Sequence, residues 1–149
     1  MDASVTKFER DINAWIQKTK IGPSLVLRKL ALDLYTGVVT RSPVDSGRFR
    51  ASHRIGINHV DDTVAPEGDH DTGAVAGDAA TGDEIRGALL TLKSAKFGDT
   101  INVSNSLVYG PPLEAGSSAQ TDHAPDGIYG ASYHEMVANL DAALRRFKT

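Results

Sequence analysis

The chain has 149 residues, a formal net charge of −3 and no cysteine. The length predicts a single domain, 1–149, that can bury a core without covalent cross-links. The absence of cysteine excludes disulfides, thiolate metal sites and cysteine nucleophiles, and it favours synthesis in a cytosol. The negative charge argues against a general nucleic-acid-binding protein, because phosphate contacts need clustered Lys and Arg. No secretory signal and no apolar run of about 18 residues is present, so we expect no membrane association.

Two helices are predicted in the first third of the chain. Residues 4–18 repeat apolar side chains at helical spacing, which is typical of an amphipathic helix. A second helix is predicted over residues 23–41, because Pro23 suits a first helical position and Pro43 disfavours helical geometry at Ser42. This helix carries two apolar stripes, and we expect both to be buried. They are Leu27, Leu30, Ala31, Leu34 and Val38, and Leu25, Leu32, Tyr35 and Val39.

A turn and a strand should follow. Residues 44–47, Val-Asp-Ser-Gly, combine side chains that bond nearby backbone with a glycine that can take positive φ. Alternation of apolar and polar residues from Phe49 to Ile57 then predicts a strand with one face on the core. His53 falls on the core face, where we expect its hydrogen bonds to be satisfied. The outward face would carry a basic row, made of Arg48, Arg50 and Arg54.

The basic row has two interpretations. An exposed charged face discourages aggregation at a sheet edge. Alternatively, the arginines contact acidic residues of an adjacent subunit or partner, where bidentate pairing would fix orientation.

Residues 58–82 are rich in Asp, Gly, Ala and Thr and poor in bulky side chains. Such a stretch buries too little apolar surface to order itself, so we expect a long, flexible acidic loop or hairpin. Its Asp and His residues also suggest a metal site, but their spacing matches no calcium-loop pattern. We therefore assign no metal ligand and no cofactor.

The second half of the chain predicts a helix, a strand and a helix. Thr81 and Glu84 form a capping box that starts the first of these helices, and Gly98 follows its end. A strand is expected over 100–104 and a closing helix over 129–147. The expected buried stripes are Ile85, Ala88, Leu89 and Leu92 on the first helix, and Tyr133, Met136, Val137, Leu140, Leu144 and Phe147 on the last.

The predicted fold class is α+β. A small, mainly antiparallel sheet would be flanked by two N-terminal helices and a C-terminal helix, with one long acidic loop. The sequence contains no nucleophile elbow and no phosphate-binding glycine loop, so catalytic residues are not assigned and the chain is not predicted to be an enzyme. Two alternatives stay open: a small metal-dependent enzyme that uses the Asp and His loop, and an adaptor domain that binds a protein through the doubly apolar helix.

Two short motifs together resemble the neck and tail-completion proteins of tailed bacteriophages, the family that builds the joint between head and tail. The first is a Pro-Val-Asp-Thr-Gly-Arg turn between a helix and a strand. It is matched by Pro43, Val44, Asp45, Gly47 and Arg48, with Ser46 in place of Thr. The second ends a later strand and is matched by Tyr109, Glu114 and Gly116, whereas Gly110 replaces the usual Ala and Pro111-Pro112 is an insertion.

The resemblance implies a structural virion protein of the head–tail connector, of the tail-completion or tail-terminator type. Such a protein is made in the bacterial host cytoplasm and forms a ring, commonly of six subunits, through which DNA passes without specific binding. Its partners would be copies of itself, the adjacent neck proteins and the tail tube. Which of the neck rings the chain would form stays open.

The resemblance also implies roles for named residues. The motif residues, together with Arg50 and Arg54, would form the interface with other subunits or partners, and Glu114 would contact Arg48 or Arg50. The acidic residues of the loop would line the lumen, where they repel DNA phosphates, or would dock on the next ring. These acidic residues are Asp61, Asp62, Glu67, Asp69 and Asp71.

Overall fold

The computed structural model describes residues 10, 13–14, 22–42, 47–67, 78–107 and 127–146. In chain order they form helix α2 (Pro23–Arg41), a 3-10 turn (Arg50–Ser52), strand β1 (His53–Ile57), helix α3 (Gly82–Leu92), strand β2 (Ile101–Asn105) and helix α5 (Tyr129–Arg146). The expected small α+β fold is confirmed. Most of the helix predicted over 4–18 lies outside the described residues; Arg10, Asn13 and Ala14 are helical and exposed.

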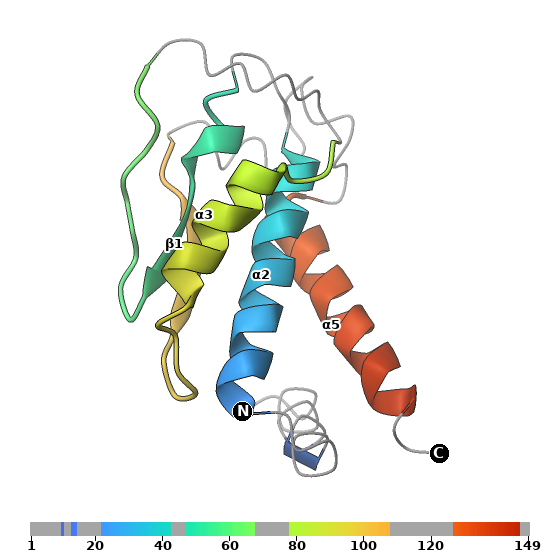
Figure 1. Ribbon diagram of the computed structural model, residues 1–149. Coiled ribbons are helices and arrows are strands. Elements are labelled where there is room, and N and C mark those ends of the chain that lie inside the picture. Colours follow the sequence, from blue (N-terminus) through green and yellow to red (C-terminus); the bar gives the residue numbers. More distant parts are fainter. Residues whose placement is uncertain are drawn as a thin grey trace.

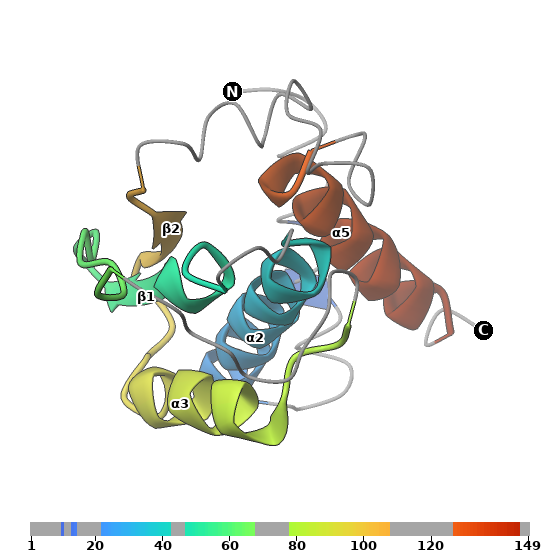
Figure 2. The same ribbon diagram turned by 90° about the horizontal axis from the view of Figure 1, so that it is seen from above.

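Helix α2 is the central element. It packs against α5 on one side and against α3 and the sheet on the other (Figures 1 and 2). Two apolar clusters fill these contacts, so the predicted burial of α2 on two sides is confirmed, although Leu25 is exposed. One cluster joins Val38 to Phe49, Leu107 and Ile128, and the other joins Ala31 to Ile55, Ala88, Leu92 and Ala95.

The sheet has two antiparallel strands in the described part of the chain, with Ile55 opposite Val103 and Gly56 opposite Asn102. Because side chains alternate along a strand, the two faces differ in character. Ile55 and Val103 belong to the apolar cluster shared with α2 and α3. The other face carries Arg54, Gly56, Asn102 and Ser104.

Residues 58–67 cover this second face. Figure 1 shows them, in green, passing back alongside β1. Asn102 Nδ2 donates to the carbonyl of His59 at 3.0 Å, and Ser104 Oγ donates to the carbonyl of Asp61 at 3.2 Å. Gly56 permits this close approach, because a Cβ there would lie 2.2 Å from the His59 oxygen. Residues 58–67 form neither helix nor strand, as expected for a loop, but side chains of the sheet bond their backbone; residues 68–77 lie outside the described residues.

The strand predicted from Phe49 begins only at His53. The reason is a tight turn: Gly47 has a φ of 82°, and the Ala51 amide donates to the Gly47 carbonyl at 2.9 Å. Ser52 Oγ also donates to the Arg48 carbonyl at 2.7 Å. These local bonds satisfy the backbone in a 3-10 turn, so the sheet ladder starts later.

The later elements agree with prediction in type and nearly in extent. Thr81 and Glu84 form the expected capping box at the start of α3, and α5 begins at the predicted residue. Two residues placed on buried stripes are exposed instead, Leu89 on α3 and Tyr133 on α5. Within the described residues, none of the helices is both long enough and apolar enough to cross a bilayer.

Candidate functional site

Arg50 is buried, although the sequence pattern placed it on an outward basic face. Its side chain is 2% exposed and makes a bidentate ion pair with Glu84 through Nε, at 3.2 Å, and Nη2, at 2.9 Å. Nη1 donates to the carbonyl of Asp78 and Nη2 to that of Ala79, both at 2.9 Å. One guanidinium therefore fixes the chain that enters α3 onto the turn before β1.

Glu84 links this ion pair to the helix cap. Its Oε1 accepts from the Thr81 amide at 2.9 Å as well as from Arg50. Burial alone would raise the pKa of Glu84, but the hydrogen bonds from Arg50 and Thr81 outweigh it and lower that pKa. The carboxylate stays ionised, and the buried arginine keeps its counter-charge.

Arg48 and Arg54 hold the other end of the acidic stretch. Arg48 Nε donates to the carbonyl of Ala65 at 2.9 Å, and Arg54 Nε donates to Thr63 Oγ1 at 3.0 Å. Thr63 Oγ1 in turn donates to Asp61 Oδ1 at 2.6 Å. Hydrogen bonds from the hydroxyl and the amide of Thr63 lower the pKa of Asp61.

The prediction of an outward basic row is thus wrong for Arg50, its central residue. The turn at Arg50–Ser52 breaks the two-residue alternation, so Arg50 faces inward. Arg48 and Arg54 are half-buried and bind the chain's own 63–65 region. Arg50 cannot serve as an exposed interface residue, and its acidic partner is Glu84; the expected partner Glu114 lies outside the described residues.

A second buried polar group joins α2, β1 and α5. His53 is 3% exposed, with Nε2 2.5 Å from Ser42 Oγ and Nδ1 2.7 Å from the Tyr129 hydroxyl. Ser42 Oγ donates its one proton to the Val38 carbonyl at 2.7 Å. His53 Nε2 must therefore carry a proton and donate to Ser42, which leaves Nδ1 to accept from Tyr129. The expectation of a core histidine with satisfied hydrogen bonds is confirmed.

The Ser42–His53 pair has the spacing of a nucleophile and its base but not the chemistry. Burial lowers the pKa of His53 to about 3; the Glu84 charge opposes this shift, and Arg50 adds to it. A base with so low a pKa takes up a proton poorly near neutral pH. Ser42 is fully buried and already donates to Val38. The pair therefore stabilises the junction of three elements and does not form a triad with an open substrate position.

The remaining predicted site residues fall in two groups. Gly47 supplies the positive φ that the first motif requires, and Asp62 and Glu67 are exposed on the covering segment. The others lie outside the described residues. These are Pro43, Val44, Asp45, Tyr109, Glu114, Gly116, Asp69 and Asp71.

Sequence reasoning missed the residues that receive the arginines and build the polar core. Glu84 was recognised only as a helix cap, although a capping carboxylate has a second oxygen that can bind a guanidinium. Asn105 lies just beyond the strand expected over 100–104, and no role was predicted for it. Its Nδ2 donates to the Phe49 carbonyl at 2.9 Å, and its Oδ1 accepts from the Leu107 amide at 3.1 Å.

No group of three or more His, Asp or Glu side chains that could hold a metal ion occurs within the described residues. The metal alternative uses the Asp and His loop, of which Asp69, His70 and Asp71 lie outside the described residues. Comparison with known proteins adds no further assignment: no family model, no curated protein and no solved structure matches the chain.

Proposed function

We propose that the chain is a structural protein of the joint between head and tail of a tailed bacteriophage, of the tail-completion or tail-terminator type. It assembles with copies of itself into a ring, six-fold by analogy with the resembling family, through which DNA passes without specific binding. It contacts adjacent neck proteins and the tail tube, is located in the virion and performs no catalysis.

The observation that carries this proposal is the conformation of Gly47 and Arg48, the two residues of the first motif that the structure describes. Gly47 takes a φ of 82°, and Arg48 then bonds the Ala65 carbonyl. These two motif residues turn the chain from the end of α2 into β1 and attach the covering segment to that turn. The sequence of a long helix, a Gly-Arg turn, a strand, an insertion, a helix, a strand and a closing helix supports the resemblance over the described residues.

The acidic covering segment gives the second support. Asp62 and Glu67 are exposed on 58–67, which the sheet holds in place. A fixed acidic surface repels DNA phosphates if it faces a lumen, and it pairs with basic groups if it faces another protein. For either role in a DNA-conducting ring, an acidic surface held in place is better suited than an acidic loop without attachments.

The proposal is tested by the oligomeric state of the purified full chain. Light scattering over a wide concentration range, with negative-stain imaging of the same samples, should detect a closed ring. Each sample is also measured with EDTA and with added calcium or magnesium. A ring that EDTA leaves intact is the expected result. A monomer at every concentration contradicts self-assembly, and a monomer that metal stabilises and activates would favour the alternative of a metal-dependent enzyme.

A further inference from the structure

Helix α3 presents an apolar and basic surface that the rest of the described chain leaves open. Leu89 and Leu90 are 49% and 61% exposed, whereas Leu92 on the same helix is buried. Lys93 follows at the spacing that places it beside both exposed leucines, and the Lys93 amide bonds the Leu89 carbonyl at 3.0 Å. Large exposed apolar side chains next to each other on one helix are typical of a contact surface.

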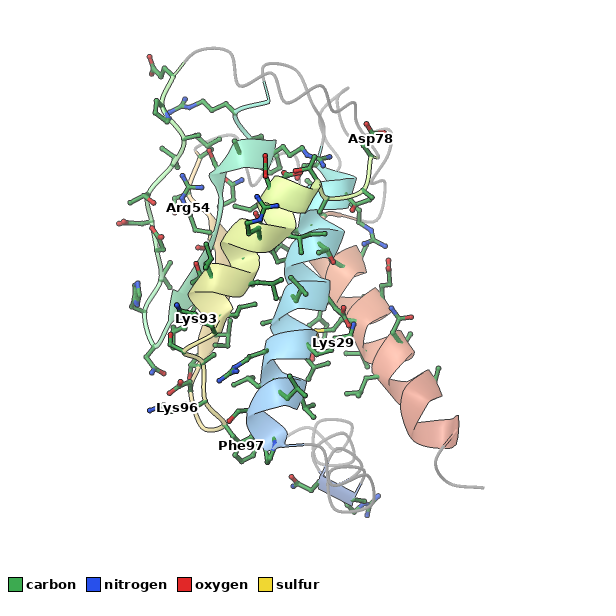
Figure 3. All side chains as sticks on the ribbon, in the orientation of Figure 1. Lys29, Arg54, Asp78, Lys93, Lys96 and Phe97 are labelled. Carbon is green, nitrogen blue, oxygen red and sulfur yellow. The ribbon has the colours of Figure 1, made fainter. Side chains whose placement is uncertain are left out.

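Two further exposed residues extend this surface beyond the end of α3. Figure 3 shows Lys93, Lys96 and Phe97 following one another down this side of the molecule. Phe97 is 62% exposed. We call Leu89, Leu90, Lys93, Lys96 and Phe97 the α3 surface; it combines apolar side chains with two exposed positive charges.

Residues 58–67 present a surface of complementary character. Asp62 and Glu67 are exposed and negative, and Val60, at 58% exposure, adds an apolar side chain. The segment is held on the sheet by Asn102, Ser104 and Arg54. Little further ordering is therefore needed before it binds, and preorganisation of this kind favours association. We call Val60, Asp62 and Glu67 the acidic surface.

The two surfaces do not pair within one chain, although their near ends adjoin: the Lys96 amide and Asn58 Nδ2 both donate to the Asp99 carboxylate, at 2.8 and 3.0 Å. Helix α3 contacts the sheet from the face that carries Ile55, whereas 58–67 cover the face that carries Gly56. Figure 2 likewise shows α3 and the 58–67 segment on different sides of β1. Because the two surfaces lie over opposite faces of the sheet, a contact that covers both joins two copies. Repeating a head-to-tail contact of two different surfaces gives a ring when the rotation closes.

We propose that the α3 surface of one copy of this chain docks on the acidic surface of a second copy. Lys93 and Lys96 face Asp62 and Glu67, while the exposed leucines and Val60 cover each other. The inference rests on the proposed ring and names the surfaces that build it. It also assigns the 58–67 part of the acidic stretch to the contact between subunits instead of to the lumen.

Charge reversal on each surface separately provides the test. The first variant is Lys93→Glu/Lys96→Glu, and the second is Asp62→Lys/Glu67→Lys. Each variant alone should raise the concentration at which half of the chain is assembled by at least about tenfold, because like charges then face each other. Sedimentation velocity on the full chain measures this midpoint, and thermal unfolding shows whether each variant is folded.

Mixing the two variants distinguishes a facing pair from two unrelated surfaces. In an equal mixture, every junction between unlike variants regains opposite charges, so assembly should return towards the wild-type midpoint. The chain with all four substitutions should assemble likewise. A helix that the substitutions merely destabilise would not be rescued by the second variant. Lys29→Glu is a control for charge reversal away from both surfaces: this lysine lies on α2, on the side towards α5 (Figure 3). Because Lys29 pairs with Asp33, the thermal unfolding of this variant is measured as well.

Every outcome decides the inference. Wild type that assembles, with variants that assemble equally well, overturns this contact and leaves the proposed ring standing. Variants that both fail and do not rescue each other show that the two surfaces do not face one another. Wild type that stays monomeric at all concentrations overturns both this contact and the self-assembled ring.

Discussion

The two ends of the 58–82 stretch are held in contrasting ways. At the start, 58–67 are bonded by several half-exposed side chains of the sheet, each making one contact with the backbone or a hydroxyl. At the end, one buried guanidinium bonds two carbonyls and the Glu84 carboxylate. The start of the stretch is thus attached through several side chains and its end through one. Single substitutions at the two ends should therefore differ widely in the free energy of unfolding that they remove.

Arg50→Met should have the largest effect, a loss of about 3–5 kcal/mol in the free energy of unfolding, because it removes the counter-charge of Glu84 and the Arg50 hydrogen bonds to two carbonyls. Denaturant unfolding measures it. Arg50→Lys should recover only part of the loss, since an ammonium cannot reproduce the planar fork. The double change Arg50→Met/Glu84→Gln should cost less than the sum of the single changes, because Gln still caps the helix and no buried charge remains. A loss below about 1 kcal/mol for Arg50→Met would show that the attachment through Arg50 is unimportant.

Gly56→Ala tests the attachment of 58–67 at the point where its backbone approaches the sheet most closely. The added Cβ would lie 2.2 Å from a backbone oxygen of His59 and 3.1 Å from the Asp61 amide nitrogen, so 58–61 must move. We expect a loss of about 3 kcal/mol, at the upper end for overpacking, because backbone cannot rotate away as a side chain can. Thermal unfolding measures it. Gly87→Ala in α3 is the control: nothing lies within 4 Å of its Cβ position, and alanine there should be stabilising. Equal effects of the two changes would contradict the close approach.

The difference between the two ends also explains what the sequence could predict. The bounds of α2 and the start of α3 follow from local signals, Pro23 and the Thr81–Glu84 pair, and the structure has both. Arg50 was misplaced because a 3-10 turn rotates successive side chains by about 120° instead of the 180° of a strand, so alternation counted through it points the wrong way. Donors to backbone carbonyls carry no signature either, since every residue offers a carbonyl.

His53 lies between the two attachments, and its protonation should make stability depend on pH. The pKa is about 3 in the folded chain and 6.5 in the unfolded chain. Below pH 6.5 the unfolded state therefore takes up a proton that the folded state cannot, so stability is complete above pH 6.5 and falls as the pH drops towards 3. At pH 5 the loss should be about 2 kcal/mol relative to neutral pH.

Denaturant unfolding at pH 7, 6 and 5 measures this loss, and His53→Gln is the comparison, because glutamine cannot be protonated. Between pH 7 and pH 5, the free energy of unfolding should fall by about 2 kcal/mol less in the variant than in the wild type. Glu84 contributes in a lower window: its lowered pKa stabilises the fold above about pH 4.5, the unfolded value, and that contribution is lost as the pH falls through the folded value. Identical slopes in wild type and variant would contradict the lowered pKa of His53 in the folded chain.

The smallest effects are expected from Asn102→Ala and Ser104→Ala, each of which removes one donor to a carbonyl of the covering segment. We expect each to cost about 1 kcal/mol or less in global stability, because the half-exposed carbonyl can bond water instead. The exposed Ser94→Ala is the control for loss of a hydroxyl.

Local order in residues 58–67 should respond to these changes more than global stability does. The Ala65 amide, bonded to Ser52 Oγ at 3.0 Å, should exchange its hydrogen faster as the segment opens more often. If the start of the stretch is attached through several side chains, the double variant should still lose less global stability than Arg50→Met does. A loss as large as that of Arg50→Met would mean that these two bonds act as a single cooperative anchor, and the contrast between the two ends would then disappear.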